Sequence, residues 1–195
     1  MALTFDACSS PGRDRCDREV VDWLIRTRTP ATLFLGGKWM EEQPAVVRRL
    51  AEQPFLELGT HGYMHERPAA LTDGLLRADL EHALAVHEAL TGCRPALFRA
   101  PYAARDDRVT RIAASLGLTT VEYDVDSGDP DPAFDAERLE RWVGRQTRNG
   151  SIIVMHMNGR GWHTAEALPR IVKRLRAAGF ELVTIGDLLR PAASR

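Results

Sequence analysis

The chain has 195 residues, of which 44% are hydrophobic and 27% charged, a composition typical of a globular protein. Its 26 Lys and Arg residues are balanced by 27 Asp and Glu residues, so no excess charge favours nucleic acid or an acidic membrane surface. No apolar run is long enough to span a bilayer. We therefore expect one domain, residues 1–195, whose function depends on local groups of side chains.

Seven short apolar runs are predicted strands: 2–6, 31–36, 55–58, 96–99, 119–124, 151–155 and 181–184. Amphipathic stretches between them predict helices, the longest over about 75–90, and Gly179 is expected to end the helix that contains 168–175. This alternation predicts a parallel α/β fold. If many strand ends converge on one site, a distorted, incomplete (β/α) barrel of about seven strands fits better than an open sheet.

The three cysteines, Cys8, Cys16 and Cys93, are too few for a disulfide framework and leave at least one thiol unpaired. A bridge between Cys8 and Cys16 is left open. Because Met1 leads almost directly into a predicted strand, no signal peptide is recognised. Two interpretations of the compartment stay open: a cytoplasmic protein, or a secreted or cell-wall enzyme whose leader was removed. We expect a monomer.

Chemically active residues follow most of the predicted strands, where parallel α/β folds place their chemistry. Asp6 ends the first strand, "GTHGYMH" follows the third and "VMHMN" ends the sixth. Within the second of these segments, His61 and His65 have the H-x3-H spacing that brings two imidazoles to one face of a helical turn. Such a pair suits zinc or another borderline divalent ion.

The segment "FRAPY" covers the end of the fourth strand. Arg99, at the end of an apolar strand, needs a carboxylate partner if it is buried. Pro101 fixes the backbone and lacks its own N–H, which leaves the N–H of Tyr102 available to a ligand.

His156 emerges from a core strand, where a histidine is well placed as a general acid. Asp124, Asp126 and Asp129 are candidates to orient His156 or to pair with Arg99, and some of them are expected only to form turns. Trp162 and His163 follow in a glycine-containing loop that is a candidate wall of a substrate groove.

The order of these segments resembles the polysaccharide deacetylase family, also called NodB-homology deacetylases or carbohydrate esterase family four. The resemblance runs from "LTFDA" through "GTHGYMH", "FRAPY" and "VEYDVDSGD" to "SIIVMH" and "ALPRIVKRLRAAGFELVTIGDLL". Members have a distorted (β/α) barrel and use a divalent metal to remove N-acetyl groups from amino sugars. The resemblance therefore implies hydrolysis of a carbon–nitrogen amide bond in a chitin-like or peptidoglycan-like substrate.

Position by position, the resemblance implies roles for the same residues. Asp6 matches the catalytic base, His61 and His65 the metal histidines, Arg99 the arginine that orients the base, and His156 the acid. The aspartate that tunes this acid corresponds to Asp129 or Asp126, between which spacing alone does not choose. The main-chain N–H of Tyr102, beside Pro101, would hold the oxyanion, and Trp162 would contact substrate.

Two positions depart from the family pattern. The family usually reads T-F-D-D, whereas Ala7 stands here in place of the second aspartate, which completes the metal site. The fifth-strand motif usually ends in aspartate then tryptophan, whereas Pro130 follows Asp129, so that wall of the acyl pocket is altered.

Three replacements for the missing carboxylate remain open: the Cys8 thiolate, Asp6 moving onto the metal, or a solvent molecule or His163. The metal expected from the resemblance is zinc, with cobalt, nickel or manganese as alternatives.

The expected partner is an N-acetylated carbohydrate, and no nucleic acid or membrane span is expected. Two other functions stay open on the same scaffold. One is hydrolysis of another small amide or ester. The other is carbohydrate binding by a pseudoenzyme that lost its metal with the second aspartate.

Overall fold

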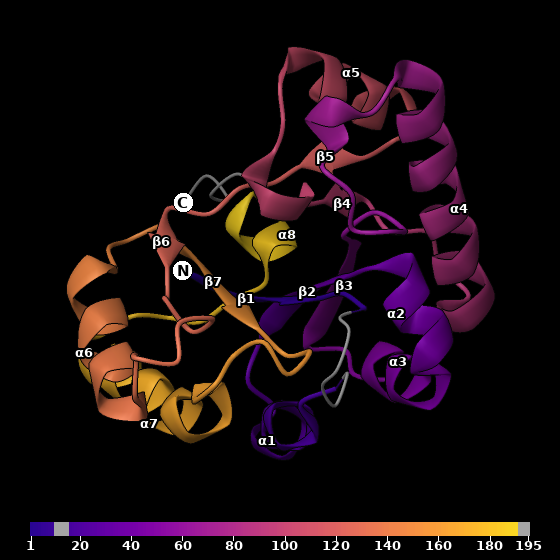
Figure 1. Ribbon diagram of the computed structural model, residues 1–195. Coiled ribbons are helices and arrows are strands. Elements are labelled where there is room, and N and C mark those ends of the chain that lie inside the picture. The colour runs from indigo at the N-terminus through magenta and orange to yellow at the C-terminus, as the bar shows by residue number, and fades with distance from the viewer. Residues whose placement is uncertain (10–15, 191–195) are drawn as a thin grey trace.

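The computed structural model describes residues 1–9 and 16–190. A parallel seven-stranded sheet in the order β5-β4-β3-β2-β1-β7-β6 forms its centre (Figure 1). The strands are β1 (Ala2–Ala7), β2 (Ala31–Leu35), β3 (Leu56–Thr60), β4 (Leu97–Phe98), β5 (Thr119–Thr120), β6 (Val125–Asp126) and β7 (Ile152–His156). The sheet curls into an incomplete (β/α) barrel, as the sequence predicted. The strands β5 and β6 form its two edges.

The α-helices are α1 (Arg18–Thr27), α2 (Gly37–Glu42), α3 (Pro44–Ala51), α4 (Asp73–Thr91), α5 (Asp107–Ser115), α6 (Ala136–Gln146), α7 (Thr164–Ala177) and α8 (Ile185–Leu188). Short 3₁₀ turns, η1 (Pro68–Ala70) and η2 (Pro101–Ala103), lie between strands and helices. The predicted long helix is α4, which begins at the side-chain cap Thr72 and ends at Gly92, whose φ is +74°. Gly179 follows α7 with a φ of +85°, as its expected role at that helix end requires.

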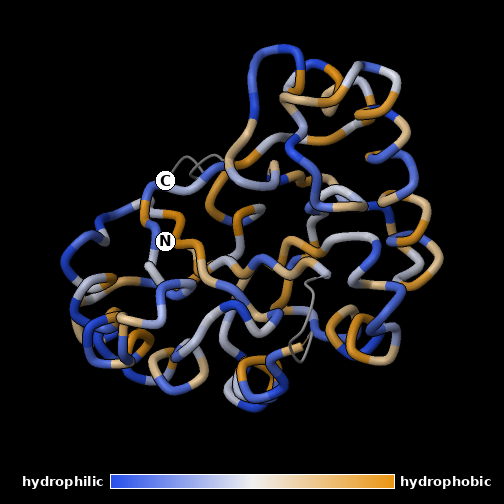
Figure 2. The backbone as a smooth tube through the Cα atoms, viewed as in Figure 1, coloured by the Kyte–Doolittle hydropathy of each residue, from blue (hydrophilic) through white to orange (hydrophobic). Residues whose placement is uncertain are grey.

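The central strand β1 is buried along its whole length, because its run of apolar residues packs on both faces of the sheet. Its register is fixed on both sides: Asp6 pairs with Phe34 of β2 and with His156 of β7. Hydrophobic residues lie mainly on the strands and on the inner sides of the helices (Figure 2). The packed core therefore holds the ends of β1 and β7 in a fixed relation.

Two strand predictions were wrong. The run 119–124 is not one strand, because its first residues form β5 at one edge of the sheet and β6 begins just beyond it at the opposite edge. The run 181–184 forms no strand. It makes only two main-chain contacts with the start of the chain, in which the N–H of Val183 donates to the carbonyl of Met1 and the Met1 amino group donates to the carbonyl of Glu181.

Cys8, Cys16 and Cys93 form no disulfide within the described residues, so the open question of a Cys8–Cys16 bridge is answered against it. In the same residues, no helix combines the length and apolar character that crossing a bilayer requires.

Candidate active site

One pocket collects side chains from the carboxyl ends of several strands. Its lining residues are Asp6, His61, His65, Ala100, Tyr102, Ala103, Tyr123, Asp126, Pro130, Val154, His156 and Arg160. The chemically active members come from the segments that the sequence singled out, apart from Arg160. The curled sheet thus brings together residues that lie as far apart in sequence as Asp6 and His156.

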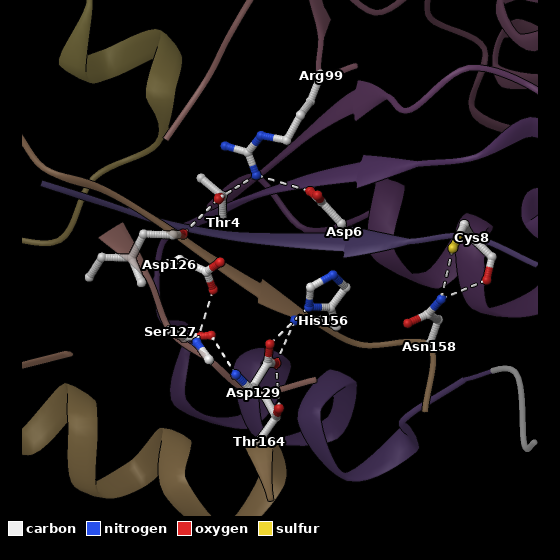
Figure 3. A network of polar contacts seen from close by, with 12 residues as sticks. Thr4, Asp6, Cys8, Arg99, Asp126, Ser127, Asp129, His156, Asn158 and Thr164 are labelled. Carbon is white, nitrogen blue, oxygen red and sulfur yellow. Dashed lines mark hydrogen bonds and ion pairs between the residues drawn. The ribbon is translucent and has the colours of Figure 1, made fainter. Parts of the chain in front are cut away.

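Asp6 is buried and paired with Arg99, whose Nη1 donates to Asp6 Oδ1 at 2.9 Å and to Thr4 Oγ1 at 2.7 Å (Figure 3). Burial alone would raise the pKa of Asp6, but the charge of Arg99, helped by His61 and His156, lowers it. The carboxylate therefore stays ionised inside the protein. The Arg99 guanidinium also lies 4.1 Å from the centroid of the Phe34 ring, a cation–π contact that holds its plane.

His156 is bound to Asp129 by its main chain and its side chain. Asp129 Oδ2 accepts from the His156 N–H at 2.7 Å, and Oδ1 lies 2.8 Å from His156 Nδ1 (Figure 3). Thr164 Oγ1 donates to the same Oδ2 at 2.6 Å. Burial alone would lower the pKa of His156, but the Asp129 carboxylate outweighs it and raises that pKa. Of the candidate aspartates, Asp129 is thus the one that contacts His156.

His61 and His65 lie side by side, with ring centroids 5.0 Å apart. The Nδ1 atom of His61 is 2.8 Å from the main-chain carbonyl of Arg99, so Nδ1 carries the proton and Nε2 keeps its lone pair. Burial lowers the pKa of His61, and burial together with His61 and Arg160 lowers the pKa of His65 to about 3. Both rings are therefore neutral, which is the form that can bind a metal.

The backbone is strained beside these rings. His65, Tyr102 and Ala103 have φ values of +59°, +59° and +50°, in the left-handed region that non-glycine residues rarely adopt. All three line the pocket, and the ring centroids of His65 and Tyr102 are 4.6 Å apart. Such strain costs about 1–3 kcal/mol a residue and is concentrated at functional sites in proteins.

A site with three protein ligands for a metal is not formed. Within residues 1–9 and 16–190, no three His, Cys, Asp or Glu side chains gather closely enough to hold an ion. Ala7 is fully buried and packs in the main core cluster. His61 and His65 fit a divalent ion as imidazole donors, but they are one ligand short of a catalytic zinc site.

The predicted third ligands do not supply the missing donor. Asp6 Oδ2 lies 3.7 Å from His61 Nε2, while Oδ1 is engaged by Arg99. The Cys8 Sγ accepts from Asn158 Nδ2 at 3.1 Å, and Figure 3 shows the thiol turned toward Asn158. Burial raises the pKa of the Cys8 thiol, which disfavours the thiolate that zinc needs. His163 is the residue before α7 and does not line the pocket.

The remaining predicted residues lie around the pocket in different ways. Asp126 lines it, and its Oδ1 accepts from the N–H of Gly128 at 2.9 Å. Pro101 is buried in η2, beneath the pocket residue Tyr102. Trp162 is 47% exposed in the loop after β7, where its main-chain N–H donates to the main-chain carbonyl of Asp129. Asp124 lies elsewhere, since its carboxylate accepts from Ile152 and Ser151 at the start of β7.

Sequence analysis assigned no role to two polar pocket residues, Arg160 and Tyr123. Arg160 follows His156 by four positions and is flanked by Gly159 and Gly161, a pattern that indicated only a loop. Tyr123 was assigned to the interior of a strand, whereas it lies in the connection between β5 and β6.

A carboxylate and a histidine that face one pocket form the arrangement that general acid–base hydrolysis requires. The family model for polysaccharide deacetylases matches residues 1–121, more than half of the 195 residues, and the chain therefore belongs to that family. The family assignment made from the sequence motifs is confirmed. Polysaccharide deacetylases hydrolyse amide bonds, and members of carbohydrate esterase family four are generally metal-dependent.

Two curated relatives match most of the chain. The chitooligosaccharide deacetylase of Bradyrhizobium sp. is 29% identical over 205 residues, covering 95% of this chain and 89% of that protein. The uncharacterised protein YlxY of Bacillus subtilis is 28% identical over 169 residues, which is 85% of this chain and 50% of YlxY. The chain thus spans half the length of this second relative.

A similar solved structure is that of a Bacillus anthracis protein described as a pseudoenzyme of carbohydrate esterase family four. It has a TM-score of 0.86 and 25% identity, covering 97% of this chain and 64% of that one. A mutant of that protein, described as having restored enzymatic activity, has a TM-score of 0.87 and 26% identity, over 97% of this chain and 66% of that one.

Proposed function

We propose that the chain is a deacetylase that removes N-acetyl groups from a chitin-like or peptidoglycan-like amino-sugar chain, with residues 1–195 as its single catalytic domain. The observation that carries the proposal is the presence of two bonded pairs at one pocket, Asp6 with Arg99 and His156 with Asp129. Family membership and the similarity to a chitooligosaccharide deacetylase support this choice of substrate.

Asp6 is the proposed general base. Its lowered pKa keeps it ionised at neutral pH, so it can accept a proton from the water that attacks the acetamide carbonyl. Oδ2 is available for this step because Arg99 engages Oδ1. Arg99 therefore acts as a positioning residue that fixes the carboxylate and keeps it charged.

His156 is the proposed general acid. Its raised pKa favours the protonated ring, and Asp129 fixes that ring from Nδ1. Nε2 is then the atom that would protonate the departing amine. The main-chain N–H of Tyr102 would bind the oxyanion, and Trp162 would offer its exposed ring to a sugar.

His61 and His65 are the residues proposed to hold a divalent metal, zinc above cobalt, nickel or manganese, because paired imidazoles are borderline ligands. When bound, such an ion polarises the acetamide carbonyl and lowers the pKa of water. With Ala7 in place of a carboxylate, we propose that solvent completes the ligand shell and that the ion is held weakly. Asp6 ranks behind solvent because its available oxygen, Oδ2, is the one proposed to act as the base, and Cys8 ranks behind solvent because its sulfur is bonded to Asn158.

A second candidate function is carbohydrate binding without hydrolysis. It is favoured by Ala7, which removes a donor from the site, and by the similarity to a structure described as a pseudoenzyme. The retained pairs of Asp6 with Arg99 and His156 with Asp129 favour hydrolysis instead, since binding a sugar requires neither a buried base nor a charged acid.

The test is acetate release from acetylated chitooligosaccharides and from peptidoglycan glycan strands, measured with and without added zinc. The proposal predicts release that zinc stimulates. Binding of the same glycans without any acetate, at every zinc concentration, would contradict it and favour the second candidate. The variant Asp107→Asn, which changes an exposed carboxylate at the start of α5, is the matched control for substitutions of Asp6.

A further inference from the structure

Arg160 lines the pocket but has no role in the proposed acid–base chemistry. It is exposed and lines the same pocket as Asp6, His65 and His156. Its charge helps to lower the pKa of His65 and opposes the rise in the pKa of His156 that Asp129 causes. Its guanidinium therefore lies within electrostatic reach of the reacting region.

The loop that carries Arg160 is firmly positioned. A Cβ atom on Gly161 would lie 2.0 Å from Thr164 Oγ1 and 2.6 Å from Asp129 Oδ2, so this glycine packs directly against the groups that fix His156. Gly159 has a φ of +76°, and the N–H of Trp162 donates to the carbonyl of Asp129 at 3.0 Å. Arg160 is thus presented beside the acid by a short, tightly packed turn.

The positive charge of Arg160 has no carboxylate partner within 4.0 Å in residues 1–9 and 16–190, although it reaches the Cys8 thiol. That thiol is neutral, since burial raises its pKa, so it does not compensate the charge. The acidic groups nearby are already engaged: Asp6 with Arg99, Asp129 with His156, and Asp126 with the Gly128 N–H.

We propose that Arg160 binds a carboxylate on the substrate, so that the enzyme prefers an N-acetylated amino sugar that carries an acidic substituent, as the lactyl ether of a muramic acid unit does. The guanidinium fork matches a carboxylate with two parallel hydrogen bonds, which a neutral chitin-like unit cannot offer. This inference rests on the proposed function, because it names the substrate class of the same pocket.

The experiment measures dissociation constants by calorimetry for a short glycan containing N-acetylmuramic acid and for the same glycan with its carboxyl group reduced to an alcohol. Arg160→Gln removes the charge, and Arg160→Lys keeps it without the fork. Arg145→Gln changes an exposed arginine on α6, away from the pocket, and is the matched control.

We expect the wild type to bind the carboxylate glycan about 10- to 100-fold more tightly, the range for a hydrogen bond to a charged group. Arg160→Gln should reduce that ratio to near one, Arg160→Lys should give an intermediate ratio, and Arg145→Gln should preserve it. Equal binding of the two glycans by the wild type, or a preference that survives Arg160→Gln, would overturn the proposal.

Binding separates this inference from the proposed function, because it requires no turnover. Selective binding of the carboxylate glycan without acetate release would overturn the deacetylase function and leave the role of Arg160 standing. Acetate release without selective binding of the carboxylate glycan would overturn the role of Arg160 and leave the deacetylase function standing. Equal loss of acetate release from both glycans in Arg160→Gln would indicate a role in the reaction itself and contradict recognition.

Discussion

Asp6 and His156 are register partners on the neighbouring parallel strands β1 and β7. Each is bound to a residue of opposite charge, Asp6 to Arg99 from the end of β4 and His156 to Asp129 from the loop after β6. The proposed base and the proposed acid, held in one hydrogen-bonded register, keep a fixed separation. This relationship underlies the predictions that follow.

The pKa of His156 is predicted to fall when its carboxylate partner is removed. In the wild type, the negative charge of Asp129 outweighs the effect of burial on the pKa of His156. Asp129→Asn keeps the shape of the side chain but removes this charge, so burial should lower the pKa of His156 below its wild-type value. NMR titration of the imidazole resonances measures it. Asp126→Asn, which changes a pocket carboxylate bonded to Gly128, is the control and should have the smaller effect. A larger fall of the His156 pKa in Asp126→Asn than in Asp129→Asn would show that Asp126 is the carboxylate that controls this pKa.

Ala7→Asp is predicted to strengthen zinc binding. The new carboxylate would supply the third donor that His61 and His65 lack, and we expect a gain of at least about tenfold, since even outer-sphere partners have effects of that size. Competition with a chromophoric zinc indicator measures the affinity. Ala7→Asn has a similar shape without the charge and should gain little. Unchanged affinity in Ala7→Asp would mean that the loss of this carboxylate does not limit the site.

Cys8 is predicted to be unreactive and dispensable for metal binding. Burial raises the pKa of its thiol, so alkylation by iodoacetamide at neutral pH should modify the exposed Cys93 first. Mass spectrometry of the peptides gives the order. Cys8→Ala should leave zinc affinity unchanged, and a weakened affinity in that variant would revive thiolate ligation.

Arg99→Leu is predicted to destabilise the fold strongly, because it leaves the Asp6 carboxylate buried without its partner. Breaking a buried ion pair in this way costs about 3–5 kcal/mol. Urea denaturation monitored by circular dichroism measures the free energy of unfolding. In the variant that combines Arg99→Leu with Asp6→Leu, no unpaired charge remains and the loss should be smaller than in Arg99→Leu alone. A larger loss in the double variant would contradict the pairing.

Much of the site could be predicted from where polar residues follow apolar runs. Asp6, His61 and His156 each stand at the end of a buried strand, and parallel strands bring those ends to one edge of the sheet. The choice between Asp126 and Asp129 could not be made. It depends on the turn at Gly128, whose φ of +78° directs the next residue toward His156.

Other features depend on tertiary contacts that no local pattern encodes. The run 181–184 has the composition of a strand, but its main chain bonds to Met1, the residue before β1, and joins no strand of the sheet. The short strands β5 and β6 lie at opposite edges of the sheet although few residues separate them. The predicted strand 119–124 therefore contains β5 but ends just before β6. Arg160 belongs to no periodic sequence pattern. Only its position in the pocket that also contains His65 and His156 distinguishes it from other surface arginines.

The most direct test of the central claim is kcat/KM for acetate release by Asp6→Asn, His156→Gln and the variant that combines them. If the two residues are base and acid of one reaction, each single change should lower kcat/KM by at least about 100-fold, and the double change should lower it little further. Asp107→Asn, at the exposed start of α5, is the control and should retain activity. Single variants within a few-fold of the wild type would contradict the account.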